Sequence, residues 1–222
     1  MPRVARNVFA GIPHHITQRG NRREDVFFED GDRSVYLEWL AHYCQKFDVD
    51  VLAYCLMTNH VHLVLTPHDE DGLQNVLKPL HMRYAQHINK AKSWRGHLWQ
   101  DRFFSSALDD AYTCSAIRYV ERNPVEAGML AQAEAYPWSS AASRCGLKVC
   151  SFLAKPPRAL RTLPGSEWAR WLAVPEAEAN VVLLRRHVEK GLPCGGEGFL
   201  AGLEALAGKS LRYRAQGRPK KG

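Results

Sequence analysis

Apolar residues follow two different spacings along the first half of the chain, and each spacing predicts a different element. Short alternating or continuous apolar runs are typical of strands, and they fall over residues 12–18, 49–57, 60–65 and the second part of 98–108. Apolar residues three and four positions apart are typical of helices, and they fall over residues 32–47, 72–91 and 109–123. Pro124 disfavours helical backbone at Asn123, so we expect the last helix to end there.

The order strand–helix–strand–strand–helix–strand–helix favours an α+β domain. An antiparallel four-stranded sheet with helices packed on one face is the economical arrangement of these elements. The pattern weakens after Gly128, and residues 150–166, with three prolines, are interpreted as a linker. Short helices are predicted over 177–189 and 198–206. We therefore expect three parts: a domain over 1–149, a linker and helical extension over 150–208, and a basic tail over 209–222.

Composition narrows the class of protein. The 222 residues are 45% hydrophobic and 24% charged, values typical of a soluble globular protein. No apolar stretch approaches the roughly 20 residues of a membrane span, and the basic N-terminus lacks the hydrophobic run of a signal peptide. We therefore expect a cytoplasmic location and no membrane contact. The six cysteines include no Cys-x-x-Cys pair, which argues against a zinc ribbon and against a disulfide framework.

The charge distribution indicates a polyanionic partner. The net charge is +7 and the pI about 9.2. Six basic residues and no acidic one follow position 208, and such a run is typical of contact with nucleic-acid phosphates. They are Lys209, Arg212, Arg214, Arg218, Lys220 and Lys221. The alternative is a solvated basic tail without a target.

Two histidines one residue apart, His60 and His62, carry the clearest candidate chemistry. Alternate side chains of a strand project from one face, so these imidazoles form half of a metal site. Tyr119 and Asn123 are four residues apart and share a helix face, and an amide oxygen is an acceptable ligand for a hard cation. If this helix crosses the histidine face, Asn123 completes a three-ligand site beside Tyr119. The alternatives are a structural histidine pair, a core tyrosine and an asparagine bonded to the backbone.

The order of these residues resembles a known family. Asn59-His60-Val61-His62 matches the HUH motif, two histidines separated by a hydrophobic residue, and Tyr119-x-x-x-Asn123-Pro124 is similar to the motif of single-tyrosine HUH transposases. The chain most resembles the REP-associated tyrosine transposases (RAYT proteins), where REP denotes a repetitive extragenic palindrome. The segments that carry the resemblance are 15–21, 59–62, 98–103, 119–128, 136–140, 191–193, 203–206 and 217–221. Glu126 departs from the pattern, since many relatives have a basic residue there.

The resemblance implies a ferredoxin-like HUH fold and a specific chemistry. Tyr119 is then the nucleophile that cleaves single-stranded DNA near a hairpin, leaving a 5′-phosphotyrosine and a free 3′-hydroxyl so that strands can be rejoined. His60, His62 and Asn123 hold a divalent cation, Mg²⁺ or Mn²⁺ by resemblance, although imidazole softness alone favours Zn²⁺. Relatives act as monomers or homodimers. A free tyrosine has a pKa of about 10, and the sequence names no general base for Tyr119.

Recognition of a DNA hairpin requires basic side chains for phosphates and aromatic side chains for stacking. The candidates are Arg19, Arg22, Arg23, Arg83, Arg95, Trp99, Arg102, Arg118 and Arg122, together with the six basic residues of the tail. A core position for Trp99 and solvated helix charges for Arg118 and Arg122 are the alternatives. Two other functions stay open: a metal-dependent nuclease that hydrolyses DNA with a bound water, and a DNA-hairpin-binding protein without catalysis.

Overall fold

One antiparallel sheet organises the chain, and the computed structural model describes residues 7–213 of it. The strands are β1 (His14–Arg19), β2 (Val49–Leu56), β3 (His60–Pro67) and β4 (Phe104–Ala107). The helices are α1 (Asp30–Lys46), α2 (Gly72–Lys92), α3 (Asp110–Glu126), α4 (Ala141–Arg144), α5 (Gly165–Ala173), α6 (Glu178–Lys190) and α7 (Glu197–Ala207). Short 3-10 turns lie at Asn21–Arg23, Ala133–Ala135 and Arg158–Leu160. Within residues 7–213, no helix is both long and apolar enough to cross a membrane.

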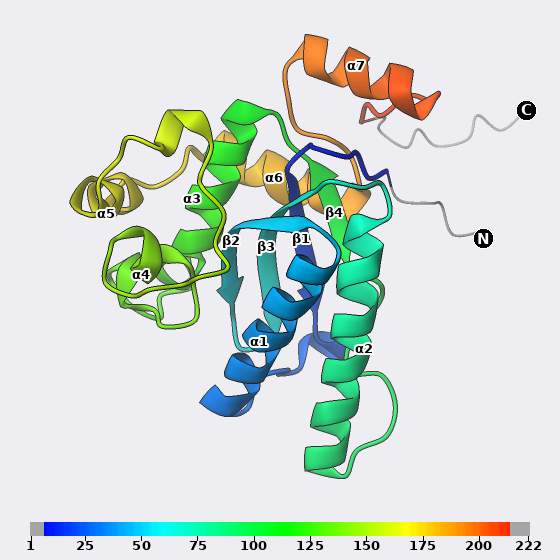
Figure 1. Ribbon diagram of the computed structural model, residues 1–222, viewed down its shortest axis with the longest axis vertical. Coiled ribbons are helices and arrows are strands. Elements are labelled where there is room, and N and C mark those ends of the chain that lie inside the picture. Colours follow the sequence, from blue (N-terminus) through cyan, green and yellow to red (C-terminus); the bar gives the residue numbers. More distant parts are fainter. Residues whose placement is uncertain (1–6, 214–222) are drawn as a thin grey trace, which may run out of the picture.

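The strand order is β2-β3-β1-β4, and each neighbouring pair runs antiparallel (Figure 1). With α1 and α2 as the two connecting helices, this is the β-α-β-β-α-β topology of ferredoxin-like folds. The predicted α+β class and the four-stranded antiparallel sheet are therefore confirmed. The histidine strand β3 is central: His62 lies opposite Thr17 of β1 on one side and Cys55 of β2 on the other.

The helices cover both faces of the sheet, so the expectation of helices on a single face is wrong. α1 and α2 pack on one face, whereas α3 crosses β2 and β3 on the other, with α6 beside it over β4 (Figure 1). Alternation along β3 shows the division, because Leu63 and Leu65 belong to the α1 and α2 cluster and Val64 belongs to the α3 cluster. A strand covered on both faces needs apolar residues at consecutive positions, as in this run.

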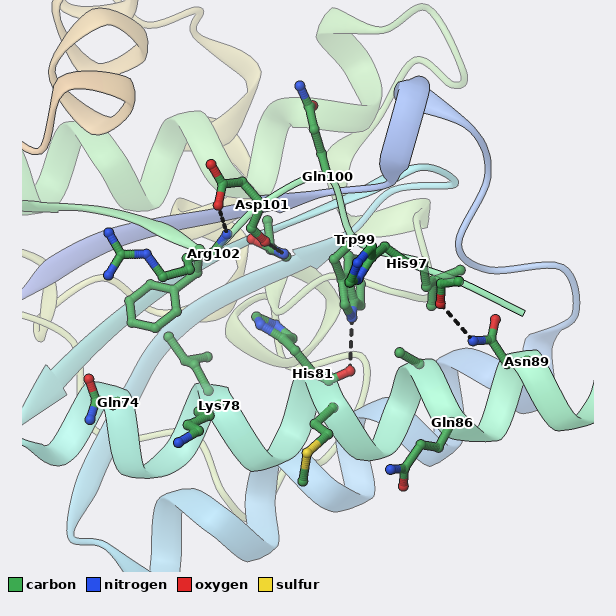
Figure 2. Close-up of a pocket in the computed structure, with 17 residues that line it drawn as sticks. Gln74, Lys78, His81, Gln86, Asn89, His97, Trp99, Gln100, Asp101 and Arg102 are labelled. Carbon is green, nitrogen blue, oxygen red and sulfur yellow. Dashed lines mark hydrogen bonds between the residues drawn. The ribbon is translucent and has the colours of Figure 1, made fainter. Parts of the chain in front are cut away.

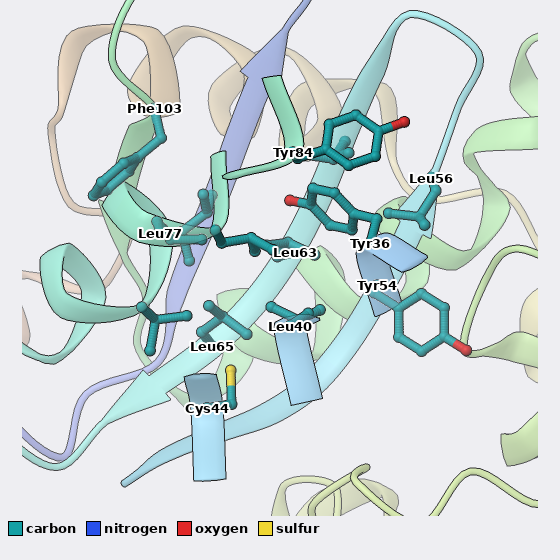
Figure 3. Packing of buried hydrophobic residues seen from close by; sticks show 14 of the residues in the cluster. Tyr36, Leu40, Cys44, Tyr54, Leu56, Leu63, Leu65, Leu77, Tyr84 and Phe103 are labelled. Carbon is teal, nitrogen blue, oxygen red and sulfur yellow. The ribbon is translucent and has the colours of Figure 1, made fainter. Parts of the chain in front are cut away.

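The layer between the sheet and the first two helices is a dense apolar core. Figure 3 shows its centre, where α1 contributes Tyr36, Leu40 and Cys44, α2 contributes Leu77 and Tyr84, and β3 contributes Leu63 and Leu65. The tyrosine hydroxyls are satisfied inside it: Tyr84 donates to the Val26 carbonyl at 2.7 Å, and the Tyr36 oxygen lies 3.0 Å from His81 Nε2. This layer fixes β3, and with it the positions of the two histidines.

Helix α3 continues past Pro124, so the predicted end at Asn123 is wrong. A proline inside a helix lacks the N–H that would bond the carbonyl four residues earlier, at Val120. Here both Asn123 and Pro124 are buried, and the Ala127 amide still donates to the Asn123 carbonyl at 3.0 Å. Packing on both sides of the helix outweighs the missing bond. The helix start is as predicted, with the Asp109 carboxylate capping the Tyr112 amide at 2.8 Å.

Residues 150–166 do not form a free linker, and a helix that the pattern did not predict begins near their end, at Gly165. The Ala154 amide donates to the Val51 carbonyl at 2.9 Å, which ties this segment to β2. α5 begins directly after Pro164, whose carbonyl accepts from the Trp168 amide at 2.9 Å. Trp168 and Leu172 of α5 and Leu184 of α6 are buried in the same cluster as Val120 of α3. The extension therefore completes the core on the second face of the sheet.

Short pieces of the later chain also pair with the outer strands. Ser139 bridges Cys55, and Leu153 bridges Val51, both on the outer edge of β2. On the opposite edge, the Cys194 amide donates to the Ala107 carbonyl at the end of β4 at 2.8 Å. Both edges of the sheet are thus partly paired within the chain.

Candidate active site

The central strand and the covering helix bring the predicted side chains together. His60 and His62 project from β3 toward α3, and Tyr119 and Asn123 project from α3 toward them. The rings of His62 and Tyr119 meet edge to face, with centroids 5.5 Å apart, and the rings of His60 and His62 lie 4.9 Å apart. The predicted condition, a helix that crosses the histidine face, is therefore met.

A third histidine belongs to this cluster. His15 of β1 stacks on His62, with ring centroids 5.3 Å apart and its Nε2 3.1 Å from His62 Nδ1. It also meets the Tyr119 ring edge to face at 5.8 Å. His15 was predicted only as part of a family segment. Its position follows from the strand pairing. His15 lies opposite Val64, and His62 lies two residues from Val64 along β3, on the same face of the sheet.

Burial keeps these imidazoles neutral. The pKa of His60 falls to about 4 because of burial and the positive charge of Arg19, and a hydrogen bond with the Asn123 side chain opposes the fall. Burial lowers the pKa of His15 to about 3. The pKa of His62 lies well below its usual range, through burial and then through the neighbouring His60 and His15. A neutral imidazole keeps the lone pair that a metal ligand needs.

The donor set fits a divalent cation when the amide is included. His60 Nδ1 lies 2.6 Å from the Asn59 side-chain oxygen, so Nδ1 carries the proton and Nε2 keeps its lone pair. The Asn123 amide is hydrogen-bonded to the same imidazole. Within residues 7–213, no set of three or more His, Cys, Asp or Glu side chains is arranged so that all of them could bind one metal ion. The candidate ligands are therefore two imidazoles and one amide oxygen, from His60, His62 and Asn123.

An arginine of the extension reaches the tyrosine. Arg185 of α6 donates from Nε to the Tyr119 hydroxyl at 3.1 Å, and its guanidinium carbon lies 5.5 Å from the ring centre. No pattern in the sequence links Arg185 with Tyr119, because the contact depends on how α6 packs beside α3. Sequence reasoning therefore missed this residue.

These side chains line a cavity of about 610 Å³. Two predicted DNA-binding residues, Arg19 and Arg23, line the same cavity, and so does Arg185. Two acidic residues, Glu126 and Glu189, complete the charged part of the wall. Because Tyr119 is only 4% exposed, a substrate reaches it through this cavity.

A second cavity, of about 790 Å³, lies beside the first between α2 and residues 96–103 (Figure 2). Gln18 and Gln100 line both cavities. Its other polar side chains include Gln74, Lys78, Gln86, Asn89 and Arg102. Trp99 borders it but is only 9% exposed, and its indole donates to the His81 carbonyl at 2.9 Å. Trp99 is therefore a core residue that supports the wall, in line with the alternative that the sequence left open.

The other predicted DNA-binding residues of the domain lie in different settings. Arg22 and Arg95 are exposed, and Arg83 stacks on Trp39 with its guanidinium carbon 4.3 Å from the ring centre. Arg118 pairs with Glu176 at 3.4 Å, and Arg122 bonds the Leu172 carbonyl and Glu126. Both arginines of α3 thus hold the extension, and neither lines the tyrosine cavity.

The basic tail is described only in part. Lys209 is exposed, and Arg212 forms ion pairs with Glu197 at 2.7 Å and Glu204 at 3.2 Å. The remaining predicted residues, Arg214, Arg218, Lys220 and Lys221, lie outside the described residues.

The fold and the site together define a class of proteins: a ferredoxin-like α+β sheet that presents paired histidines to a tyrosine on a covering helix. The chain belongs to the family described as transposase, IS200-like, whose model matches residues 9–123, slightly more than half of the 222. The comparison with curated proteins gives no match.

Two solved structures are similar in fold. A REP-associated tyrosine transposase bound to a REP hairpin has a TM-score of 0.52 and 17% identity, over 69% of this chain and 98% of that chain. A putative transposase from Deinococcus radiodurans R1 has a TM-score of 0.38 and 17% identity, over 55% of this chain and 97% of that chain. The first of these likenesses supports the fold.

Proposed function

We propose that this protein is a REP-associated tyrosine transposase: a metal-dependent transesterase that binds a DNA hairpin and cleaves and rejoins single strands through Tyr119. The observation that supports the proposal is the meeting of Tyr119 with His60, His62 and Asn123 in one cavity. These residues come from β3 and α3, far apart in the sequence, and the family model covers all four.

In this proposal the Tyr119 hydroxyl oxygen attacks a phosphorus of the bound strand. The Oη–P bond forms while the P–O3′ bond breaks, so the 5′ phosphate stays on the protein. The phenolic proton passes to water, and the leaving 3′ oxygen takes up a proton from water. Because the phosphotyrosine retains a reactive ester, a second 3′-hydroxyl can reverse the step and join new ends.

His60, His62 and Asn123 would hold a divalent cation, Mg²⁺ or Mn²⁺ by family resemblance. Such an ion, when bound, neutralises charge that develops on the phosphate. The side chains around the site contribute by keeping both imidazoles neutral through burial and by orienting His60 through Asn59.

The proposed substrate is single-stranded DNA next to a hairpin. The solved transposase of similar fold is bound to a REP hairpin, and we extend that partner class to this chain. Arg19 and Arg23 line the tyrosine cavity, and in this proposal they contact phosphates of the strand. The adjoining cavity, with its amide side chains, offers a continuation for unpaired bases, since asparagine and glutamine bond base edges.

A denaturing gel tests the proposal. The full-length protein is incubated with Mn²⁺ and a labelled DNA hairpin that carries single-stranded flanks. We expect a covalent protein–DNA adduct that survives denaturation and is absent from Tyr119→Phe. Tyr112→Phe is a matched control because Tyr112 lies on the same helix but does not line the cavity.

The same gel separates the two alternative functions. Cleavage without an adduct, unchanged by Tyr119→Phe, would indicate a nuclease that uses a bound water. Tight hairpin binding on a matching native gel, without cleavage in Mn²⁺, would indicate a DNA-binding protein without catalysis.

A further inference from the structure

Arg185 touches the atom on which the proposed reaction depends. Its Nε–H donates to Tyr119 Oη at 3.1 Å, and its guanidinium packs against the same ring. Arg185 also lines the cavity that contains His60, His62 and Asn123. The family model ends at Asn123, so this contact comes from a part of the chain that the model does not cover.

Helix α6 presents this arginine from a fixed position. Leu184 and Val188, which flank Arg185 along the helix, are buried. The helix ends at Gly191 in a left-handed conformation, with φ of 64°, and its amide bonds the Val188 carbonyl at 3.3 Å. A side chain on a packed helix is held more accurately than one on a loop. The Arg185–Tyr119 contact is therefore a built feature of the site.

The Arg185 guanidinium has N–H donors that are not used in its contact with Tyr119. Arginine carries five N–H groups in a planar fork, and one of them, on Nε, is used on Tyr119. In the part of the chain that the structure describes, the two terminal nitrogens have no hydrogen-bond partner. Of the two acidic residues in the cavity wall, Glu126 is engaged by Arg122 at 3.0 Å. Arg185 itself is solvent-exposed, so its terminal nitrogens are accessible to an incoming phosphate.

We propose that Arg185 is a catalytic residue of strand cleavage, which holds the Tyr119 oxygen with Nε and binds the scissile phosphate with its terminal nitrogens. This role rests on the proposed function. As the Oη–P bond forms and the phenolic proton leaves to water, negative charge moves from the tyrosine oxygen to the phosphate oxygens. One guanidinium contacts both the tyrosine oxygen and the phosphate oxygens, and its planar set of N–H donors matches the geometry of a phosphate. Arg185 thus stabilises charge and does not accept the proton.

The test compares Arg185→Ala and Arg185→Lys with Arg186→Ala. Arg186 is the neighbouring arginine on α6, and its guanidinium lies 4.8 Å from the Tyr213 ring and does not line the cavity. The measurement is the single-turnover rate of adduct formation at saturating hairpin with Mn²⁺. We expect Arg185→Ala to lower this rate by about 100-fold or more, the size of effect known for removal of one charge-stabilising donor. The hairpin affinity of Arg185→Ala stays close to that of the wild type. The rate of adduct formation of Arg186→Ala also stays close to the wild-type rate.

Two further readouts separate catalysis from structure. Arg185→Lys keeps the charge and loses the fork, so it recovers only part of the rate. Methylguanidinium in the buffer restores adduct formation to Arg185→Ala and leaves Tyr119→Phe inactive. A rate of Arg185→Ala equal to or above the wild type overturns this role alone. A loss that neither lysine nor methylguanidinium recovers overturns it as well, since the contact is then structural. Absence of any Tyr119-dependent adduct in the wild type overturns the role and the proposed function together.

Discussion

The two faces of the sheet are built from the same strands but bury different chemistry. Toward α1 and α2, β3 turns Leu63 and Leu65 into an apolar cluster. Toward α3, the same strand turns His62 against His15 and Tyr119, all of them buried. Burying polar groups costs free energy unless they are bonded, and here His15 Nε2 lies 3.1 Å from His62 Nδ1, beside the apolar cluster of the second face. The first face is an apolar core, and the second combines an apolar core with the site.

The second face also contains a hydrogen-bonded network around a buried carboxyl. Glu121 of α3 is fully buried, and burial raises its pKa to about 7. It accepts hydrogen bonds from Ser140 Oγ at 2.5 Å and from the Trp168 indole at 2.8 Å. The segment of α3 next to Tyr119 is thus tied to α5 by polar contacts in addition to apolar packing.

The sharpest separation of the two faces is expected from Tyr119→Phe. The loss of one hydroxyl removes the nucleophile, so adduct formation should fall by more than about 1000-fold, a loss of about 4 kcal/mol in transition-state stabilisation. The free energy of unfolding should change by less than about 1.5 kcal/mol, because the ring packing remains and one hydrogen bond is lost. Single-turnover kinetics and urea unfolding measure the two quantities. A Phe variant that still forms the adduct would contradict the assignment of the nucleophile.

The metal ligands should also affect activity more than stability. His60→Ala should lower the adduct rate by about 100-fold or more and weaken Mn²⁺ binding, because a bound cation contributes several kcal/mol of charge stabilisation. Asn123→Ala should lower both by less, since water can replace one ligand. Titration calorimetry with Mn²⁺ gives a readout independent of activity. His68→Ala, which changes an exposed histidine paired with Asp50 at 3.1 Å, is the control. Full activity of the wild type in excess chelator would contradict the assignment of these residues as metal ligands.

On the apolar face, Leu63→Ala should reverse the pattern. Removing a fully buried leucine leaves a cavity and should lower the free energy of unfolding by about 2–5 kcal/mol. The adduct rate per folded molecule should stay near the wild type, because Leu63 points away from Tyr119. Urea unfolding and single-turnover kinetics report both effects. Leu147→Ala, at a 69% exposed leucine, should change stability by less than about 0.5 kcal/mol. An activity loss in Leu63→Ala larger than its loss of folded protein would mean that the two faces are coupled.

The smallest effect concerns pH and His14, which precedes His15 and points to the opposite face. Burial lowers the pKa of His14 to about 4, against a hydrogen bond to the Ile12 carbonyl that raises it. Between pH 6.5 and 4 the unfolded chain binds a proton that the folded chain excludes, so stability falls as the pH falls. His14→Gln should reduce the loss of stability between pH 7 and pH 4.5 by about 2 kcal/mol.

Urea unfolding at the two pH values measures this difference. Part of the acid sensitivity should remain in His14→Gln, because His15 and His60 also have lowered pKa values. His42→Gln, at an exposed histidine, is the control for replacing a histidine at the surface. An unaltered difference in His14→Gln would mean that His14 is protonated in the folded protein at pH 4.5.

Local periodicity was sufficient to predict the sheet and its first two helices. The spacings of residues 49–57 and 72–91 depend on neighbours within the same segment, and the observed elements match them within two residues. The arrangement of the helices on both faces could not be predicted in this way, because the second face is covered by α3 together with the distant α6. The passage of α3 through Pro124 likewise depends on tertiary burial, which outweighs a local preference.

The residues of the site likewise fall into those that local spacing could predict and those that depend on tertiary packing. His60, His62, Tyr119 and Asn123 could be predicted because strand and helix periodicity place each pair on one face. Arg118 and Arg122 look equally suited to phosphate in the sequence, but their partners, Glu176 and the Leu172 carbonyl, lie in the extension. Arg185 has no fixed spacing from Tyr119, so only the packing of α6 shows that it belongs to the site.

The pairing of Ser139 and Leu153 with β2, and of Cys194 with β4, affects how copies of this protein can meet. An exposed strand edge is a template on which another chain can add a strand and start aggregation. Here the chain occupies part of both edges itself. Addition of a strand from a second copy is therefore obstructed at these positions of both sheet edges.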